Sequence, residues 1–169
     1  MVAKIPTQHK MTDEATHQPI LFELIRQTKG AILELGAGYS STEQIHAMSP
    51  GRKILTVDDH QEWLDNFKHL ETDNHKFALL TDNLFALHWI LWDVVLVDLS
   101  TWDQRLWAIE QLRFYAGYMI IHDAQDKDLK RYFKYAREYR VDDFPMPTTL
   151  LGSNKYDLKS INIEGAILI

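Results

Sequence analysis

The sequence predicts an α/β protein with a doubly wound, mainly parallel sheet and helices on both faces. Short apolar runs alternate with longer amphipathic stretches along the 169 residues, which is typical of β–α–β units. Polar side chains also follow successive apolar runs, namely Asp58, Asp82, Asp98 and the pair His122–Asp123. Because parallel strands end at one edge of a sheet, where such proteins bind ligands, we expect these side chains to gather there.

The first part of the chain is expected to form a helix, a strand and a second helix. A polar residue at 12 or 13 can cap a helix that runs to about residue 28, with apolar residues at helical spacing. Residues 31–35 are apolar except for one acid and predict a buried strand. After a tight loop, residues 42–48 predict a helix, which Pro50–Gly51 ends.

The middle of the chain continues the alternation. Short apolar runs predict strands over residues 53–57, 76–80 and 93–97, and the Val and Leu run in the last of these suits a strand covered on both faces. An amphipathic stretch predicts a helix over residues 62–70. Residues 83–88 predict a short helix or a turn.

The last part predicts a helix over residues 102–115, a strand over 118–121 and a further helix over 129–138. From residue 141 onward we expect one or two shorter strands, for which an antiparallel orientation is an option, best placed at 148–151 and 166–169.

Composition restricts the class of protein. The chain has no Cys, which excludes disulfides and thiolate metal sites. Its net charge of −6 does not suit a binder of nucleic acid, and its basic stretch, residues 127–140, is expected to be a solvated helix face. No segment approaches the roughly 20 apolar residues of a membrane span, and residues 1–11 read as a loose arm rather than a secretory signal. We expect one cytoplasmic domain over residues 1–169 that binds neither membranes nor nucleic acid.

The strongest local signal is the run Gly36–Ala37–Gly38 between a strand and a helix. Glycines let the main chain approach a ligand closely, and a helix N-terminus offers free N–H groups. Glu34 is an acid inside an apolar strand, and a buried charge requires a partner such as a cationic ligand group. Asp58, about twenty residues later, could accept hydrogen bonds from a ribose.

These residues resemble the motifs of class I S-adenosylmethionine-dependent methyltransferases. Residues 32–42 (ILELGAGYSST) look like the first motif of that superfamily, and residues 55–64 (LTVDDHQEWL) are similar to the second. Residues 95–98 (VLVD) and 119–123 (MIIHD) resemble its fourth and fifth strands. The similarity covers roughly residues 31–124, and it implies a seven-stranded sheet in which the last strand inserts antiparallel.

The resemblance also implies roles for individual residues. Gly36, Ala37 and Gly38 would pack against the methionine part and the ribose of S-adenosylmethionine, with Tyr39 and Ser40 next to them in the loop. Glu34 would orient the amino group. Asp58 would hold the ribose hydroxyls, although Asp stands where Glu is more usual and Asp59 is a close alternative. The remaining cofactor-binding residues would be Asp82 and Asn83, at the adenine amine, and Asp98. Ser40 stands where many members have a third Gly.

Methyl transfer requires alignment and, for a weak acceptor, removal of a proton. We expect Asp98 and His122 to serve this chemistry, with His122 either a general base or a residue that orients Asp98. The layout is similar to that of catechol-type O-methyltransferases, which hold magnesium at these strand ends. Asp98 and Asp123 could supply two oxygens here, but His122 replaces a carboxylate and imidazole suits a softer metal, so magnesium is possible but not expected. Four further residues could line a pocket: His17, His60, His88 and Trp63.

Three functions compete. The first is a methyltransferase that acts on oxygen or nitrogen of a small molecule, with the N-terminal arm and residues 141–154 recognising the substrate and a second copy of the chain as a possible partner. The second is a non-catalytic module that binds S-adenosylmethionine or S-adenosylhomocysteine. The third is an NAD-binding protein, which fits less well because its third glycine would fall at Ser41.

Overall fold

The computed structural model describes residues 12–80, 87–88 and 90–169. The expected N-terminal arm, Asp82 and Asn83 lie outside these residues. The described residues form one eight-stranded sheet with the order β3-β2-β1-β4-β5-β7-β6-β8. The first five strands of the chain pair in parallel, and β7 runs antiparallel to both β5 and β6. This topology confirms the predicted fold class.

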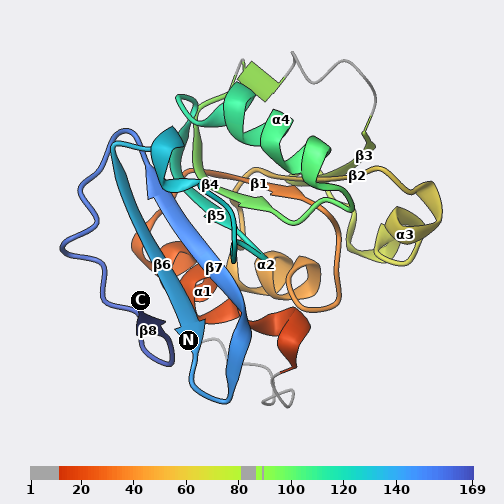
Figure 1. Cartoon of the computed structure of the whole chain (residues 1–169). Coiled ribbons are helices and arrows are strands. Elements are labelled where there is room, and N and C mark those ends of the chain that lie inside the picture. The colour runs from red at the N-terminus through yellow and green to blue at the C-terminus, as the bar shows by residue number, and fades with distance from the viewer. Residues whose placement is uncertain (1–11, 81–86, 89) are drawn as a thin grey trace.

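The elements alternate along the chain as the apolar pattern predicts (Figure 1). The strands are β1 (Ala31–Leu35), β2 (Ile54–Asp58), β3 (His75–Leu79), β4 (Trp92–Val97), β5 (Ala116–Ile121), β6 (Tyr135–Val141), β7 (Phe144–Ser153) and β8 (Ile167–Leu168). The α-helices are α1 (Gln18–Gln27), α2 (Thr42–Met48), α3 (Gln61–Asp65) and α4 (Trp102–Leu112). Among the described residues, the 3₁₀ turns include η1 (Asp13–Ala15), η2 (Lys68–Leu70) and η4 (Lys130–Tyr132).

Helices cover both faces of the sheet, because successive strand residues point to opposite sides. Leu33, Val95 and Met119 pack with the apolar face of α4 on one side. Ile32 and Leu96 pack with α1 and α2 on the other. Figure 1 shows α4 on one side of the sheet and α1 and α2 on the opposite side. The central strands are therefore buried on both faces.

The last part of the chain differs from its prediction. Residues 129–138 do not form a helix: after the single turn η4, the chain enters β6, which pairs with β7 in a long hairpin. Tyr139 and Val141 are buried at a spacing of two residues, and aromatic and β-branched residues favour strands. The helical reading was wrong because the Lys, Arg and Glu residues over positions 130–138 imitate the charged face of an amphipathic helix. Phe133, instead of a helix, covers Gly152, where any Cβ would overlap its ring.

Two smaller predictions also need correction. The expected first helix is divided into η1 and α1, with Pro19 in the first turn of α1, a position that proline favours because its missing N–H is not needed there. The sheet has eight strands rather than seven, since the two-residue strand β8 adds to β6.

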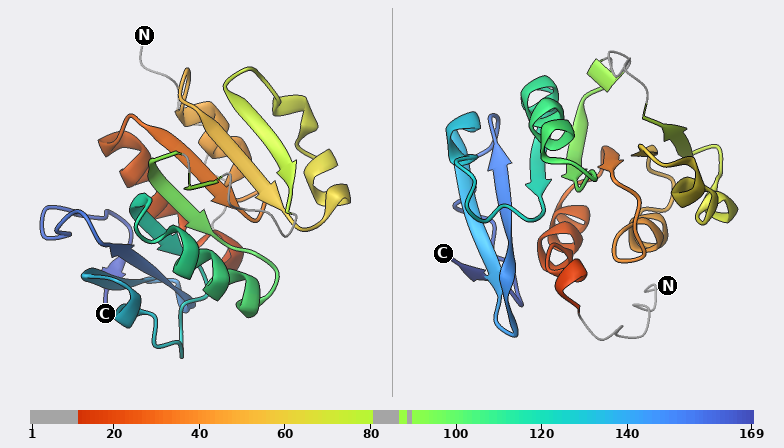
Figure 2. Two further views of the ribbon diagram at one scale, coloured as in Figure 1. Left: turned by 90° about the horizontal axis from the view of Figure 1, so that it is seen from above. Right: turned by 45° about the vertical axis from the view of Figure 1, so that its right-hand side comes forward.

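The hairpin of β6 and β7 extends beyond the sheet alongside the N-terminal elements. Figure 2 shows its tip beside the N-terminal end of α1 in the right-hand view, and β7 contacts η1. Two segments from opposite ends of the chain are thus neighbours at one edge of the sheet. Within the described part of the chain, no helix has the length and apolar character that crossing a membrane requires.

Candidate functional site

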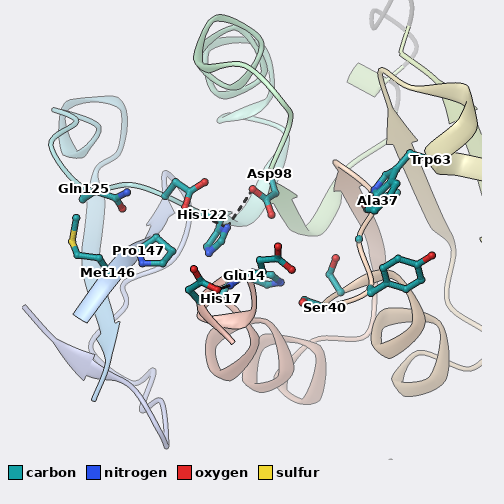
Figure 3. A pocket seen from close by; sticks show the side chains of 15 residues that line it. Glu14, His17, Ala37, Ser40, Trp63, Asp98, His122, Gln125, Met146 and Pro147 are labelled. Atoms are coloured by element: carbon teal, nitrogen blue, oxygen red, sulfur yellow. Dashed lines mark hydrogen bonds and ion pairs between the residues drawn. The ribbon is translucent and has the colours of Figure 1, made fainter. Parts of the chain in front are cut away.

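A pocket of about 570 Å³ opens at the edge of the sheet where β1, β4 and β5 end. This is the place where the strand order reverses, because the chain leaves β1 toward β2 on one side and places β4 on the other. Figure 3 shows side chains from the β1–α2 loop, the ends of β4 and β5, the N-terminal elements and β7 around it. The lining residues are Asp13, Glu14, His17, Ala37, Gly38, Tyr39, Ser40, Ser41, Trp63, Asp98, His122, Asp123, Gln125, Met146 and Pro147.

The two glycines of the β1–α2 loop have different tasks. Gly36 has φ +101°, and a Cβ at this position would overlap the carbonyl group of Asp98. Only glycine fits such a conformation and such a close approach. Gly38, in contrast, lines the pocket, and a Cβ there would meet nothing closer than Ser41 Oγ at 3.7 Å. Gly36 therefore holds the loop against the end of β4, and Gly38 leaves its main chain open toward the pocket.

Glu34 supports this loop from beneath. Its carboxyl group is completely buried and accepts a hydrogen bond from Thr42 Oγ1 at 3.1 Å, while the same hydroxyl accepts from the Gly38 N–H at 2.9 Å. Burial raises the pKa of Glu34 to about 7, against hydrogen bonds from Ser41, Thr56 and Thr42 that act to lower it. Glu34 thus acts on the pocket through Thr42 and does not itself line it.

The second oxygen of Glu34 continues into a buried polar chain. Thr56 Oγ1 donates to it at 2.7 Å and lies 3.0 Å from His75 Nε2. The other ring nitrogen of His75 lies 3.0 Å from His46 Nδ1. Burial, followed by the charge of His46, lowers the pKa of His75 to about 4, so this ring is neutral at neutral pH. Neutral donors and acceptors therefore surround Glu34 on this side.

Asp58 ends β2 and Asp59 follows it, and neither is among the residues that line the pocket. Asp58 is buried, and its two carboxylate oxygens accept from the main-chain N–H groups of Ala37 and His60, both at 2.8 Å. Burial raises the pKa of Asp58 despite these bonds. Asp59 instead accepts from Ser100 and Gln104, at 3.0 Å each. Asp58 is therefore joined to the glycine loop, whereas Asp59 joins β2 to the start of α4.

Aromatic side chains cover the outer side of the loop. Trp63 of α3 donates its indole N–H to the carbonyl oxygen of Ala37. Tyr39, which is 58% exposed, packs edge-on against Trp63 with ring centroids 5.6 Å apart. Ser40 is held by its carbonyl oxygen, which accepts from Gln18 of α1 at 2.7 Å. The loop thus presents exposed aromatic surface at one end of the pocket.

Charged side chains form the opposite wall. The guanidinium group of Arg105, buried on α4, lies 2.9 Å from Asp98 Oδ1 and 3.0 Å from Asp123 Oδ2. His122 Nδ1 lies 3.3 Å from Asp98 Oδ1 (Figure 3). Burial acts to lower the pKa of His122, but the hydrogen bond and charge of Asp98, together with Asp123, outweigh it and raise that pKa. The contact with Asp98 therefore makes His122 a holder of Asp98 more readily than a base.

The same contacts bear on the magnesium pair considered from the sequence. Arg105 already neutralises the carboxylates of Asp98 and Asp123, so a magnesium ion between them would have to compete with a buried cation. Asp123 also has φ +56°, a conformation that Asp adopts more readily than most residues in turns. The expectation from the sequence that Asp98 and Asp123 hold no magnesium stays a prediction.

His17 precedes α1 and faces the same wall. Its ring is 1% exposed and meets the ring of His122 edge-on, with centroids 4.9 Å apart. Burial, and then the charge of His122, lowers the pKa of His17 to about 4, against weaker opposing effects of Asp98 and the Ser40 main chain. Among the residues with described positions, neither ring nitrogen has a partner in hydrogen-bond geometry. Such a buried polar group requires an explanation.

The structure brings most of the predicted site residues around one pocket and leaves others apart. Those that line it are Ala37, Gly38, Tyr39, Ser40, Asp98, His122 and Asp123. Glu34, Gly36, Asp58 and Asp59 support the loop or its surroundings and are absent from the lining, while Asp82 and Asn83 lie outside the described residues. Of the side chains that the sequence suggested for a pocket, His17 and Trp63 line it. His60 and His88 are not among its lining residues.

Sequence reasoning missed Arg105 and the pair Met146–Pro147. Arg105 lies four residues before Ile109 and seven before Leu112, on the buried face of α4, so a cation at an apolar helical position was the available signal. Met146 and Pro147 belong to the strand β7. They fall within residues 141–154, whose role in substrate recognition stays a prediction.

Several solved structures share this architecture. No protein-family model matches the chain, and no curated protein matches it. Similar solved structures include human methyltransferase-like protein 13 in complex with SAH, with a TM-score of 0.61 and 15% identity over 89% of this chain and 84% of that one. Aeropyrum pernix fibrillarin with natively bound S-adenosyl-L-methionine gives 0.56 and 15%, over 78% and 72%.

An rRNA methylase from Streptococcus thermophilus gives a TM-score of 0.57 and 16% identity, over 78% of this chain and 92% of that one. These likenesses at low identity establish the fold. The chain therefore has the fold of class I S-adenosylmethionine-dependent methyltransferases, as the motifs at residues 32–42 and 55–64 led us to expect.

Proposed function

We propose that this chain binds S-adenosylmethionine at the β1–α2 loop and transfers its methyl group to an oxygen or nitrogen of a small molecule. The observation that carries the proposal is the position of the pocket, which lies against Gly38 at the reversal of strand order and continues to Asp98 and His122. A volume of about 570 Å³ is within the range of pockets for small ligands.

The residues of the loop fit this cofactor. Gly38 has no side chain to fill the space before it, which suits the close approach of the methionine part. Each oxygen of Asp58 accepts one main-chain N–H, and a carboxylate oxygen has room for a second hydrogen bond, which a ribose hydroxyl would supply. Glu34 lies beneath the loop and would favour an ammonium group bound above it. Burial disfavours the charged carboxylate, and a nearby cation would stabilise it.

The opposite wall suits the methyl acceptor. Bound S-adenosylmethionine would supply an electrophilic methyl group, and the chain would supply alignment and a site for the proton of the acceptor. Asp98 is the proposed acceptor of that proton, since its carboxylate lines the pocket and is 26% exposed. His122 and Arg105 would hold Asp98 in position.

The pocket also suggests a class of acceptor. Four of its lining residues are Asp or Glu, and none of those described is Lys or Arg. A neutral or cationic small molecule fits such a lining better than a phosphate or a nucleic acid. A second copy of the chain as partner also remains a proposal, which native mass spectrometry tests by showing a dimer or a monomer.

Calorimetry with S-adenosylmethionine, S-adenosylhomocysteine and NAD tests the cofactor. We expect the first two to bind and NAD not to bind, and we expect Gly38→Val to abolish binding while its thermal unfolding stays near that of the parent chain. Heat on adding NAD alone would favour the dinucleotide alternative. A methyl-transfer assay over neutral and cationic acceptors follows, and tight cofactor binding without turnover on any acceptor would favour the non-catalytic module.

A further inference from the structure

Three potential metal ligands from separate elements meet at the charged wall of the pocket, beside Arg105 and Asp123. His17 precedes α1, Asp98 follows β4 and His122 follows β5. One nitrogen of each imidazole and one oxygen of Asp98 lie within 4.8 Å of one another. Figure 3 shows the three side chains directed toward the same region of the pocket.

The first indication that this cluster binds a ligand is the condition of His17. Its ring is almost completely buried and lines the pocket, and among the described residues neither nitrogen has a partner in full hydrogen-bond geometry, the main chain of Ser40 being only the smallest influence on its pKa. A buried polar group without a partner is costly, and an ion or water that supplies the missing interaction is a common explanation. An imidazole nitrogen is also among the most frequent metal ligands in proteins.

The second indication is the way in which His122 is held. Its Nε2 lies 2.9 Å from Thr16 Oγ1, and the Thr16 hydroxyl donates to the carbonyl oxygen of Asp13 at 3.2 Å. Because the hydroxyl hydrogen is used in that bond, Thr16 accepts from His122 Nε2–H. This arrangement leaves Nδ1 facing Asp98. A histidine that binds a metal through one nitrogen commonly donates from the other to such a partner, which fixes its orientation.

The charges around the cluster balance in favour of a cation. Asp98 and Asp123 carry two negative charges, and Arg105 supplies one positive charge. Arg105 pairs with Oδ1 of Asp98 and with Oδ2 of Asp123, so the other oxygen of Asp98, Oδ2, is the one that a metal ion would use. The guanidinium therefore opposes a site made of both carboxylates but leaves room for one made of His17, His122 and a single carboxylate.

We propose that His17, Asp98 and His122 bind one divalent transition-metal ion, of which Zn²⁺ is the representative, through two imidazole nitrogens and one carboxylate oxygen. This ligand set suits Zn²⁺ or a similar ion and not Mg²⁺, which prefers oxygen ligands. The pocket provides space for a fourth, exchangeable ligand. The site does not depend on the proposed methyl transfer.

A second cluster in the molecule serves as an internal comparison. Asp58, Asp59 and His60 also place one ligand atom each within 4.8 Å of one another. Both carboxylates there already accept hydrogen bonds from the protein, and the His60 side chain is 65% exposed. No buried group without a partner faces that cluster among the described residues, so we expect it to bind a metal weakly.

Calorimetry on the full-length, untagged chain, freed of metal by a chelator, tests the site with ZnCl₂ and MgCl₂ as separate probes. We expect one Zn²⁺ to bind with micromolar or tighter affinity and Mg²⁺ to bind at least tenfold more weakly. Co²⁺ as a probe should produce visible absorption bands that depend on His17. His17→Gln and His122→Gln should each weaken Zn²⁺ binding at least tenfold, whereas the matched control His60→Gln should leave it unchanged.

Thermal unfolding without metal identifies any variant that fails to fold, and His17→Asn then replaces His17→Gln. The proposal is overturned if the parent chain binds no Zn²⁺ at micromolar concentration, if Mg²⁺ binds as tightly, or if His60→Gln abolishes binding and His17→Gln does not. Failure of S-adenosylmethionine to bind would refute the proposed function and leave the metal result standing, because Zn²⁺ binding is measured without that cofactor.

Discussion

The two walls of the pocket are built from different interactions. Main-chain N–H groups and neutral hydroxyls hold the β1–α2 loop, as in the bonds from Ala37 to Asp58 and from Gly38 to Thr42. Ion pairs hold the ends of β4 and β5, where Arg105 joins Asp98 and Asp123. Backbone conformation therefore fixes the wall at the β1–α2 loop, where we propose that the cofactor binds (the cofactor wall), and side-chain charge fixes the wall at the ends of β4 and β5, where we propose that the methyl acceptor binds (the acceptor wall). Substitutions should therefore affect the two walls differently: the loop should be sensitive to changes in backbone freedom, and the other wall to changes in charge.

The largest effect is expected from Gly36→Ala. A Cβ at φ +101° is strained and would also overlap the Asp98 carbonyl, so the free energy of unfolding should fall by roughly 4 kcal/mol. Gly38→Ala is the matched control and should change it by less than about 1 kcal/mol, because its new Cβ meets only ordinary contacts. Urea denaturation measures the free energy of unfolding of both variants. Equal losses would mean that the two glycines do not differ as described.

The next effect concerns Glu34→Gln and depends on pH. Folded Glu34 keeps its proton up to about pH 7, whereas the unfolded side chain releases it near 4.5, so folding becomes less favourable as pH rises between these values. Gln carries no such proton. The variant should gain stability relative to the parent chain across this window, by about 3 kcal/mol at its upper end. Denaturation at several pH values measures the difference, and a difference independent of pH would contradict the assignment.

A smaller loss is expected on the acceptor wall from Arg105→Met. It leaves Asp98 and Asp123 without their cation, and breaking a buried pair costs about 3–5 kcal/mol. Because these carboxylates are 26% and 36% exposed, we expect about 2 kcal/mol after allowing for solvent screening. Arg131→Met is the control, since its pair with Asp128 is exposed on both sides, and it should leave the free energy of unfolding without a measurable change. Similar losses of stability in the two variants would mean that the ion pairs of Arg105 do not hold the acceptor wall together.

The smallest effect is on cofactor affinity. Asp58→Ala should weaken S-adenosylmethionine binding by about 1.5 kcal/mol, or roughly tenfold, because it removes a hydrogen-bond acceptor. Asp59→Ala is the comparison, since Asp59 faces Ser100 and Gln104, and it should change affinity less. Calorimetry on both variants decides which acid holds the ribose, and a greater loss in Asp59→Ala would reverse our assignment.

The sequence predicted the first half of the fold well because each strand there contains a compact apolar run, and the glycines at 30, 36 and 51 mark the turns around the first two. The role of Gly36 in the site could also be predicted from the sequence, since its neighbours in the chain already indicate a tight strand-to-helix turn. Tyr139 and Val141 show the weakness, because only two buried residues at a spacing of two follow the charged stretch 130–138, which imitates a helix. The hairpin turn at Asp142–Asp143 also lacks the glycine that marks such turns most clearly.

The acceptor wall was harder to predict because its partners are distant in the sequence. Asp98 and His122 could be placed at strand ends, but nothing in their own segments indicates Arg105 as their cation. His17 was recognised only as a residue that could line a pocket. Its lack of a hydrogen-bond partner depends on how η1 and α1 pack against the sheet, which no local pattern encodes.

The contact between η1 and β7 has a consequence for biosynthesis. A growing polypeptide that has reached the end of β5 contains the whole glycine loop, Asp98 and Arg105, but not Met146 or Pro147. The rim of the pocket is completed only after β7 leaves the ribosome and returns to lie beside the earliest described residues. A nascent chain without this hairpin would have the loop but only part of the enclosure around it.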